Sequence, residues 1–383
     1  MDPDRLARLE LSRLCEPGSW AVHAAVRSHG ALAVRDALRA GRVLPPIGAG
    51  LTEGARQRAE SSDLRADLAR LDRIGARFVV PGDPEWPTER LSWHDGLEHA
   101  PPLGLFLLGS GDLRQLSEHA VSVVGARAST AYGVHVAGEL GLQLADRGWT
   151  VLSGAAYGID GAAHRGALAS ERGVTVAVLA CAVDVCYPKG HTGLLAAIAS
   201  RGLVVSEHPP GCAPTRSRFL VRNRLIAALS VGTVVVEAAV RSGSLTTARQ
   251  AGSLNRHLMA VPGPVTSELS RGCHRLLREG AICVTGAPDV LDLVGALGPD
   301  AAVEARAAGH PRDELSATVR RVLDAVPVRR WAGPASIARA AGVPTLTVQQ
   351  VLPPLQLAGL VEESLDGWRL TTLGAGRPAR AAS

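Results

Sequence analysis

The spacing of apolar residues changes along the chain and divides it into regions. Up to about residue 75, segments such as LARLELSRL and AVHAAVRSHGALAVRDAL place apolar residues three and four positions apart, which predicts amphipathic helices. The stretch RADLARLDRIGARFVV then passes from a helical pattern to a short strand. A proline-rich connector follows and leads into LGLFLLG, a predicted edge strand. We therefore expect a helical N-terminal region over residues 1–75 and an extended lead-in over 76–120.

Strands and helices alternate regularly from about residue 121. The apolar segments of strand length are SVVGA, TVLSGA, TVAVLA, LVVSE, TVVVEA, LMAVPG and AICVTG, and helical stretches separate them. Strands this apolar, alternating with helices, indicate a parallel sheet that is buried on both faces. The sequence therefore predicts an α/β fold, with a Rossmann-like, doubly wound and mostly parallel sheet in a domain over 76–298.

The last part of the chain has a different pattern. Residues 299–314 are expected to form a linker, and LSATVRRVLDAV, PASIARAAGV and TLTVQQVLPPLQLAGLV predict three short helices. VEESLDGWRLT predicts two strands around an Asp-Gly turn, so residues 315–372 are expected to form a winged helix and 373–383 a disordered tail. The expected recognition helix has no Lys or Arg, unlike helices that read a DNA groove, which favours a protein-contact or regulatory role.

Composition narrows the class of partner only slightly. A net charge of +5 and a pI of about 9.1 permit a polyanionic partner without requiring one, and Lys189 is the sole lysine among 41 basic residues. The six cysteines form no CxxC or Cys/His spacing, which predicts reduced thiols in a cytoplasmic protein and no metal site. No apolar run is long enough to span a bilayer and no secretory signal is evident, so we expect no membrane association.

The loops after the predicted strands are the candidate sites, because ligands of parallel sheets bind at the carboxyl ends of the strands. No Walker motif occurs and no GxGxxG follows the first strand, so no nucleotide cofactor is expected. In GARASTAYG, Gly125 allows close approach of a ligand, Arg127 suits a phosphate, and Ser129 or Thr130 can cap a helix. In SGAAYGIDGAAH, Ser153, Gly154 and the amides after them approach a helix start, which is a natural anion site.

Two acidic residues could instead indicate catalysis. Asp160 and His164 lie four residues apart and could form an acid–base pair, but we favour a capped helix with a packed histidine, since no nucleophile or metal triad is near. Glu237 follows a strand, but a single carboxylate without a second one is weak support for an enzyme.

Three further loops combine basic, aromatic and small residues. In CAVDVCYPKGH, Tyr187, Lys189 and His191 suit phosphate and base contacts, although an ordinary surface loop is an equal alternative. RSRFLVRNRLIAALS surrounds Phe219 with arginines, which is typical of a platform that stacks single-stranded bases. In EAAVRSGSLTTARQAG a turn of small residues precedes a helix; its members are Ser242, Gly243, Ser244 and Thr246. Several strand ends thus carry anion-type loops without clustered acids for Mg²⁺, which favours binding a phosphate backbone over cleaving it.

Six motifs occur in one fixed order: GARAST-YG, SGAAYGIDGAAH, YP-K, FLVRNRLIAALS, VVVEA-VRSGSLTTA and AVPG...S-GCHRLLREGA. This order resembles the DNA-processing protein A family (DprA, also called Smf), strongly over about 120–290 and moderately from about 75. The resemblance implies a Rossmann-like domain that binds single-stranded DNA without sequence preference. It also implies protection of incoming DNA during natural transformation, or a role in general recombination, with loading of the RecA recombinase. A homodimer through the later part of that domain and no catalytic activity are implied as well.

The resemblance also implies DNA-contacting positions, which match Arg127, Ser153, Gly154, Lys189, Phe219, Arg222, Asn223 and Arg224. This chain departs from the pattern at His191, where the family commonly has Asn, and at CEPGSW, which replaces a glycine-rich helix–hairpin.

The main alternative function is a Rossmann-like nucleotide N-glycosidase that uses Glu237 or Asp160. Such enzymes have a PGGxGT-type loop, which VPGPVTSE matches only distantly. A transcription regulator that uses the winged helix is the third alternative, and its uncharged helix argues against it.

Overall fold

The computed structural model describes residues 2–93, 97–295 and 315–372. The chain divides into two compact units, 1–303 and 304–383, and each unit has its own core. The expected linker over 299–314 and the expected tail over 373–383 lie outside the described residues. No helix of the described part is long and apolar enough to cross a membrane.

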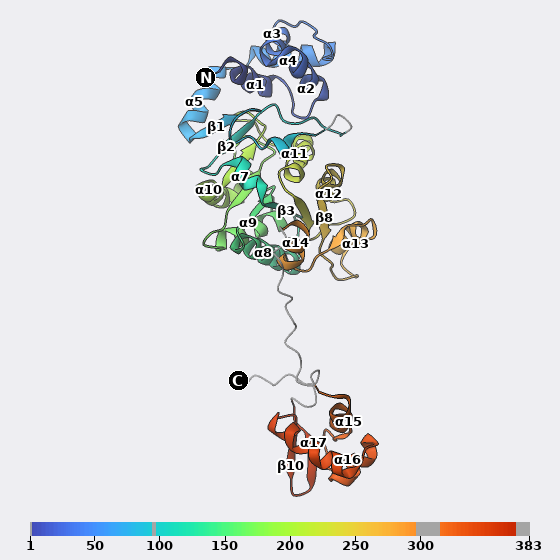
Figure 1. Ribbon diagram of the computed structural model, residues 1–383. Helices are drawn as coiled ribbons and strands as arrows, with labels where there is room; N and C mark the ends of the chain where they lie inside the picture. Colours follow the sequence, from blue (N-terminus) through green and yellow to red (C-terminus); the bar gives the residue numbers. More distant parts are fainter. Residues whose placement is uncertain (1, 94–96, 296–314, 373–383) are drawn as a thin grey trace. The chain divides into compact units, whose positions relative to one another are not determined.

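The first unit begins with five helices, of which the first four pack around an apolar core of their own and the fifth packs against the sheet. They are α1 (Pro3–Leu14), α2 (Trp20–His29), α3 (Ala31–Arg39), α4 (Ala49–Glu60) and α5 (Leu64–Ile74). Asp2, Ser19 and Asp63 cap α1, α2 and α5 by accepting backbone N–H groups. Residues of α1 to α4, including Leu11, Val22 and Leu38, form the core of this bundle, which lies at one end of the unit (Figure 1).

The rest of the unit is built on a nine-stranded sheet among the described residues. Its strands are β1 (Ala76–Val79), β2 (Leu105–Leu108), β3 (Ala120–Val124), β4 (Thr150–Ser153), β5 (Thr175–Val178), β6 (Leu203–Ser206), β7 (Gly232–Val235), β8 (His257–Ala260) and β9 (Ile282–Cys283). Their order in the sheet is β1-β2-β6-β5-β4-β3-β7-β8-β9. The seven strands from β6 to the edge strand β9 in this order are parallel to one another. The predicted mostly parallel α/β sheet is therefore confirmed.

The lead-in is where the sequence prediction was wrong. Strand β2 is not an edge strand, because it pairs antiparallel with β1 on one side and with β6 on the other. Leu105, Phe106 and Leu107 are fully buried, as expected of an interior strand. The four-residue strand β1 covers the edge instead, and two short helices, α6 (Thr88–Leu91) and α7 (Leu113–Glu118), also lie in this segment.

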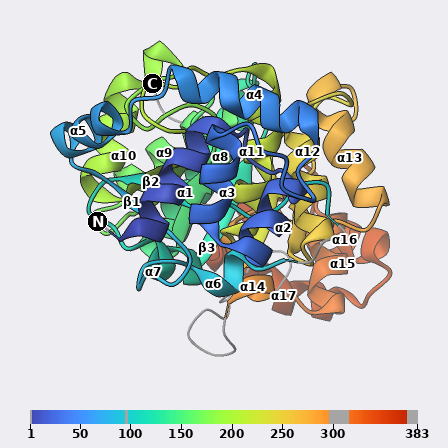
Figure 2. The ribbon, with the colours of Figure 1, turned by 90° about the horizontal axis from the view of Figure 1, so that it is seen from above.

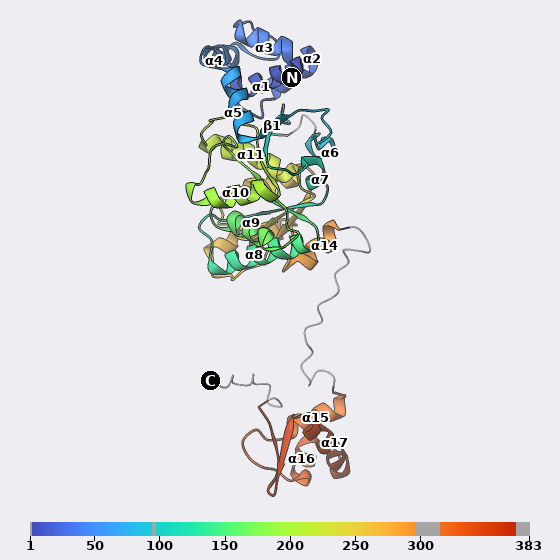
Figure 3. The same cartoon turned by 90° about the vertical axis from the view of Figure 1, so that its left-hand side faces the viewer.

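Helices cover both faces of the sheet. One face carries α8 (Ala131–Asp146), α9 (Ile159–Ala169), α10 (Thr192–Arg201) and α14 (Ala287–Val294), and the other carries α11 (Arg216–Ala228), α12 (Ser244–Ser253) and α13 (Arg271–Arg278). Figure 3 shows α8, α9 and α10 on the side that faces the viewer. In Figure 2 the bundle helices α1 to α4 lie over this layered body. Strand order reverses at β3, because β4 lies on one side of it and β7, which follows α11, on the other. Such a reversal opens a crevice at the carboxyl ends of the two strands.

The second unit contains α15 (Ala317–Ala325), α16 (Pro334–Ala341), α17 (Thr345–Leu357) and an antiparallel hairpin of β10 (Val361–Ser364) and β11 (Gly367–Leu370). Ala332 forms a further antiparallel bridge with Trp368. Three helices and a hairpin match the predicted elements, and assignment of the unit as a winged helix stays a prediction.

Glycines bring α8 and α9 close together. A Cβ added to Gly166 would lie 2.0 Å from the carbonyl oxygen of Gly138, whereas a Cβ added to Gly138 would meet nothing within 4 Å. We predict that Gly166→Ala lowers the free energy of unfolding by about 1–3 kcal/mol through overpacking. Gly138→Ala, the matched control, should be neutral or stabilise by up to about 1 kcal/mol. Urea unfolding of both variants measures this, and equal effects would contradict the close helix contact.

Candidate nucleic-acid interface

A groove of about 860 Å³ lies at the carboxyl edge of the sheet, where the strand order reverses. The loops after β3, β4, β5 and β7 line it, together with α11. The predicted site residues that it brings together are Gly125, Arg127, Phe219, Arg222, Asn223, Ser242, Gly243, Ser244 and Thr246. Most of the residues singled out in separate loops therefore meet in one place.

Helix α11 forms one wall of this groove, and its position is set by buried contacts. Thr215 caps the helix by accepting from the Arg218 N–H at 3.4 Å. The Ser122 hydroxyl, on β3, donates to the Ile226 carbonyl at 2.8 Å. The side-chain amide of Asn223 donates to the Gly243 carbonyl at 3.3 Å, which connects α11 to the loop after β7.

Arg222 lies deep in the groove with only 5% of its surface exposed. Its Nη1 donates to the Val178 carbonyl at 2.6 Å, and its buried Nε has no partner among the described residues. Burial lowers the pKa of this guanidinium to about 10, so it stays charged at neutral pH. A Cβ at Gly154 would come within 2.0 Å of Arg222 Nη1, so glycine is needed there to leave room for the arginine.

An aromatic and cationic cluster surrounds Phe219. The Arg127 guanidinium lies 4.6 Å from the centre of the Phe219 ring, and that of Arg222 lies 5.8 Å away. The Tyr187 ring centre is 5.5 Å from that of Phe219. The Phe219 ring at the groove wall therefore lies within cation–π distance of two arginines.

The groove carries a strong excess of positive charge. Its charged lining residues are four arginines (Arg127, Arg216, Arg222 and Arg241) and Asp160. Across the described residues, Arg127, Arg216 and Arg241 are exposed and form no ion pair. Burial raises the pKa of Asp160, and the nearby Arg222 opposes that rise. The sequence prediction did not select Arg216 or Arg241, although both lie next to selected residues in RSRF and VRSGS.

Comparison with known proteins agrees with this geometry. The family model for DNA recombination-mediator protein A matches residues 77–295. The chain belongs to this family. A relative in Mycobacterium tuberculosis (strain H37Rv) is 44% identical over 386 residues, which cover 99% of this chain and 97% of the relative. Protein Smf of Escherichia coli is 40% identical over 216 residues, 56% of each chain. The X-ray structure of DNA processing protein A (DprA) from Streptococcus pneumoniae superposes with a TM-score of 0.61 at 30% identity, covering 77% of this chain and 99% of that one.

Not every residue that matches the DprA pattern reaches the groove. Arg224 is only 1% exposed, and both of its terminal nitrogens donate to Glu207 at 2.8 Å. Its guanidinium also lies 5.7 Å from the Trp93 ring centre. Arg224 is therefore a buried structural residue, and the expectation that it contacts DNA is corrected on that ground.

The expected phosphate cradle at SGAAYG is also not open. The Ser153 hydroxyl is buried and donates to the Val123 carbonyl at 2.6 Å. The Ala156 N–H donates to the Asp160 carboxylate at 3.4 Å, so a carboxylate of the protein itself already accepts from an amide of this loop. Gly154 contributes by making room for Arg222. Ser129 is half-buried and Lys189 is exposed, and neither lines the groove.

The interpretation of His164 as a packed histidine is confirmed, but the expected side-chain cap is absent, because the N-cap of α9 is Gly158 and no side chain of the described residues caps it. The Nδ1 of His164 lies 2.7 Å from the Thr175 hydroxyl, and the ring is fully buried. Glu237 also has a structural role, because it accepts from the Thr130 N–H at 2.9 Å and from the Thr130 hydroxyl at 2.6 Å. Thr130 in turn caps α8 by accepting from the Gly133 N–H at 3.1 Å. His164 thus connects α9 to β5, and Glu237 supports the cap of α8.

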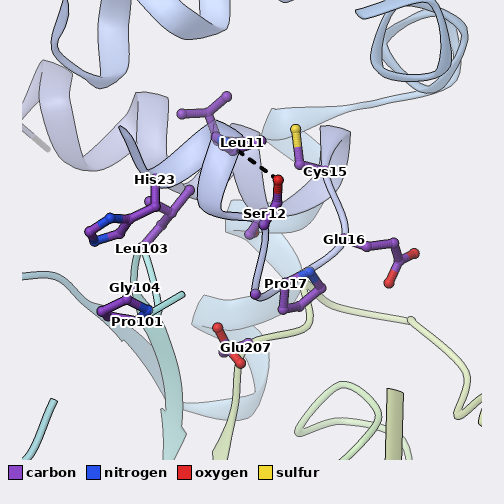
Figure 4. A pocket seen from close by; sticks show the side chains of 13 residues that line it. Leu11, Ser12, Cys15, Glu16, Pro17, His23, Pro101, Leu103, Gly104 and Glu207 are labelled. Carbon is purple, nitrogen blue, oxygen red and sulfur yellow. Dashed lines mark hydrogen bonds between the residues drawn. The ribbon is translucent and has the colours of Figure 1, made fainter. Parts of the chain in front are cut away.

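A second, much smaller cavity of about 30 Å³ lies between the turn after α1 and the segment before β2. In Figure 4, Glu207 lies beneath Pro17 of this turn. The volume holds no more than about two water molecules, so this cavity is not a ligand site.

The two Glu–Arg pairs on α11 give a matched stability test. Glu207→Ala leaves Arg224 as an unpaired buried charge and should lower the free energy of unfolding by about 3–5 kcal/mol. Glu16→Ala removes a similar pair to Arg218 (2.7 and 3.1 Å) that is more exposed, and should cost less than about 1 kcal/mol. Denaturant unfolding compares the two, and similar losses would contradict the structural importance of the buried pair.

Burial also predicts how stability depends on pH. It lowers the pKa of His164 to about 3 and that of His208 to about 4. Below the ordinary histidine pKa of about 6.5, the unfolded chain binds protons that the folded chain excludes, so stability falls as pH falls. His164→Asn should reduce this slope between about pH 6 and about pH 4 by up to about 1.4 kcal/mol per pH unit. The exposed His135→Asn is the control. If the slope of stability against pH is unchanged in His164→Asn, or changes equally in both variants, the lowered pKa of His164 is refuted.

Proposed function

We propose that this protein binds single-stranded DNA without sequence preference and acts as a recombination mediator. The observation that supports this most strongly is the charge of the groove. Four arginines line it together with one aspartate, Asp160, which lies near Arg222. Arginines neutralise phosphates irrespective of base identity, and an aromatic ring stacks on any base. Membership of the DNA recombination-mediator protein A family supports the same proposal.

The residues have separate proposed roles. Arg127, Arg216, Arg222 and Arg241 bind backbone phosphates, and Phe219 stacks a base after Arg127 moves off its face. The turn of Ser242, Gly243, Ser244 and Thr246 adds hydroxyl and amide donors at the start of α12. Lys189 adds a charge beyond the groove rim.

The proposed cellular role follows from the family. The protein would protect incoming DNA during natural transformation, or act in general recombination, and deliver the strand to a RecA recombinase in the cytoplasm. We propose a homodimer through the later part of the Rossmann-like domain. The open sheet edge at β9, where Ile282 is 40% exposed, supports this choice of surface.

We propose binding rather than catalysis. Glu237 holds Thr130 and Asp160 is held by a backbone N–H, so neither presents a free carboxylate. The alternative, a nucleotide N-glycosidase, would release free base from nucleoside monophosphates. Chromatography of such a reaction should show no base, and its release would favour the enzyme.

The proposal predicts a binding preference that depends on salt. Fluorescence anisotropy with labelled poly-dT and a matched duplex should show tighter binding of the single strand, weakened by added salt. Arg127→Ala/Lys189→Ala should reduce the salt slope by about 1.4, because two phosphate contacts are lost. Arg147→Ala/Arg172→Ala removes equal charge from exposed positions that precede β4 and β5, at the opposite edge, and should leave the slope unchanged. A wild type that ignores single strands at low salt would refute the proposal.

A further inference from the structure

We infer that Tyr187 and Tyr157 continue the groove as a row of base-stacking sites that starts at Phe219, with Lys189 binding the phosphates between them. This inference rests on the proposed binding of single-stranded DNA. It assigns a path to the bound strand, from α11 over the loops that follow β5 and β4.

Both tyrosines leave a large part of their rings exposed. Tyr187 is 38% exposed and Tyr157 is 50% exposed, in a chain with three tyrosines and three phenylalanines in total. They follow β5 and β4, which are parallel neighbours paired through Ser153 and Ala177. Neighbouring strands lie about 5 Å apart, so the two loops emerge side by side at the edge that holds the groove.

The contacts of the two rings connect them to the groove. Tyr187 lines the groove and its ring centre lies 5.5 Å from that of Phe219. The Tyr157 hydroxyl accepts from the Gly190 N–H at 3.3 Å, and so links the loop after β4 to the loop after β5. Phe219 thus contacts Tyr187 of the loop after β5, and Tyr157 of the loop after β4 contacts Gly190 and His191 of that same loop.

Tyr157 is also held in a fixed orientation. Its ring packs edge-on against His191 at 4.8 Å between centres. His191 is itself buried, with Nδ1 3.0 Å from the Ala155 carbonyl. A half-exposed ring that is held by one ring contact and one hydroxyl contact is prepared to stack a base at a small cost in conformational entropy.

Lys189 supplies the charge that such a row needs. It is exposed on a short 3₁₀ turn, η1 (Lys189–His191), between Tyr187 and the Gly190 that contacts Tyr157. Among the described residues it forms no ion pair. An ammonium on a flexible stem can follow the phosphates of a strand whose bases are stacked on the neighbouring rings.

The test separates stacking from charge by using two probes. Full-length protein is titrated against a labelled dT oligonucleotide of about 16 nucleotides and an abasic oligonucleotide of the same length, which keeps the phosphates and lacks the bases. Tyr187→Ala and Tyr157→Ala should each weaken dT binding about five-fold or more and leave abasic binding unchanged. Tyr187→Phe and Tyr157→Phe should keep wild-type affinity. Lys189→Ala should weaken both probes.

Tyr132 is the matched control. It is 43% exposed, but it does not line the groove, and its hydroxyl donates to the Pro262 carbonyl at 2.8 Å. Tyr132→Ala should change neither affinity. Tyrosine variants that leave dT binding unchanged, or that weaken both probes equally, would overturn the inference. A wild type that binds neither probe would instead refute the proposed function.

Discussion

The groove depends on how two arginines are accommodated in the buried second half of α11. A buried charge must be paired or hydrogen-bonded, because the cost of removing it from water is otherwise several kcal/mol. Arg224 meets this requirement inside the protein, through two hydrogen bonds to Glu207. Arg222, two residues earlier, donates to one backbone carbonyl and forms no ion pair among the described residues, whereas the buried Nε of each arginine lacks a hydrogen-bond partner. We propose that this difference is the basis of the site: Arg224 holds α11 in position through Glu207, and Arg222 is left to bind a phosphate.

The remaining groove residues are organised around that helix. The strand-order reversal at β3 opens the crevice, and α11 crosses beside it. Arg127 reaches over Phe219 from the loop after β3, and Asn223 fixes the loop after β7. The N-terminal bundle is connected to the same helix, because Glu16, which follows α1, pairs with Arg218 near the start of α11. The sequence-distant parts of the first unit are thus coupled through one helix.

The sequence predicted most of the sheet and most of the groove, since both follow from local patterns. Apolar strands that alternate with helices identify a parallel sheet, and ligand loops follow at its carboxyl edge. The interior position of β2 could not be predicted, because the expected short strand, β1, carries no local signal that it pairs antiparallel with β2 and covers it. Arg222 and Arg224 could not be told apart either. Only the fold brings Glu207 and Trp93 to Arg224, and Val178 to Arg222. The same holds for the SGAAYG loop, whose amides are near a carboxylate of the chain itself.

The most direct test of this account is a crystal structure of the full-length protein with a dT oligonucleotide. The account predicts a backbone phosphate within hydrogen-bonding distance of Arg222 and a strand that crosses the carboxyl ends of β3 and β7. An oligonucleotide bound elsewhere, with Arg222 still lacking an anionic partner, would contradict it.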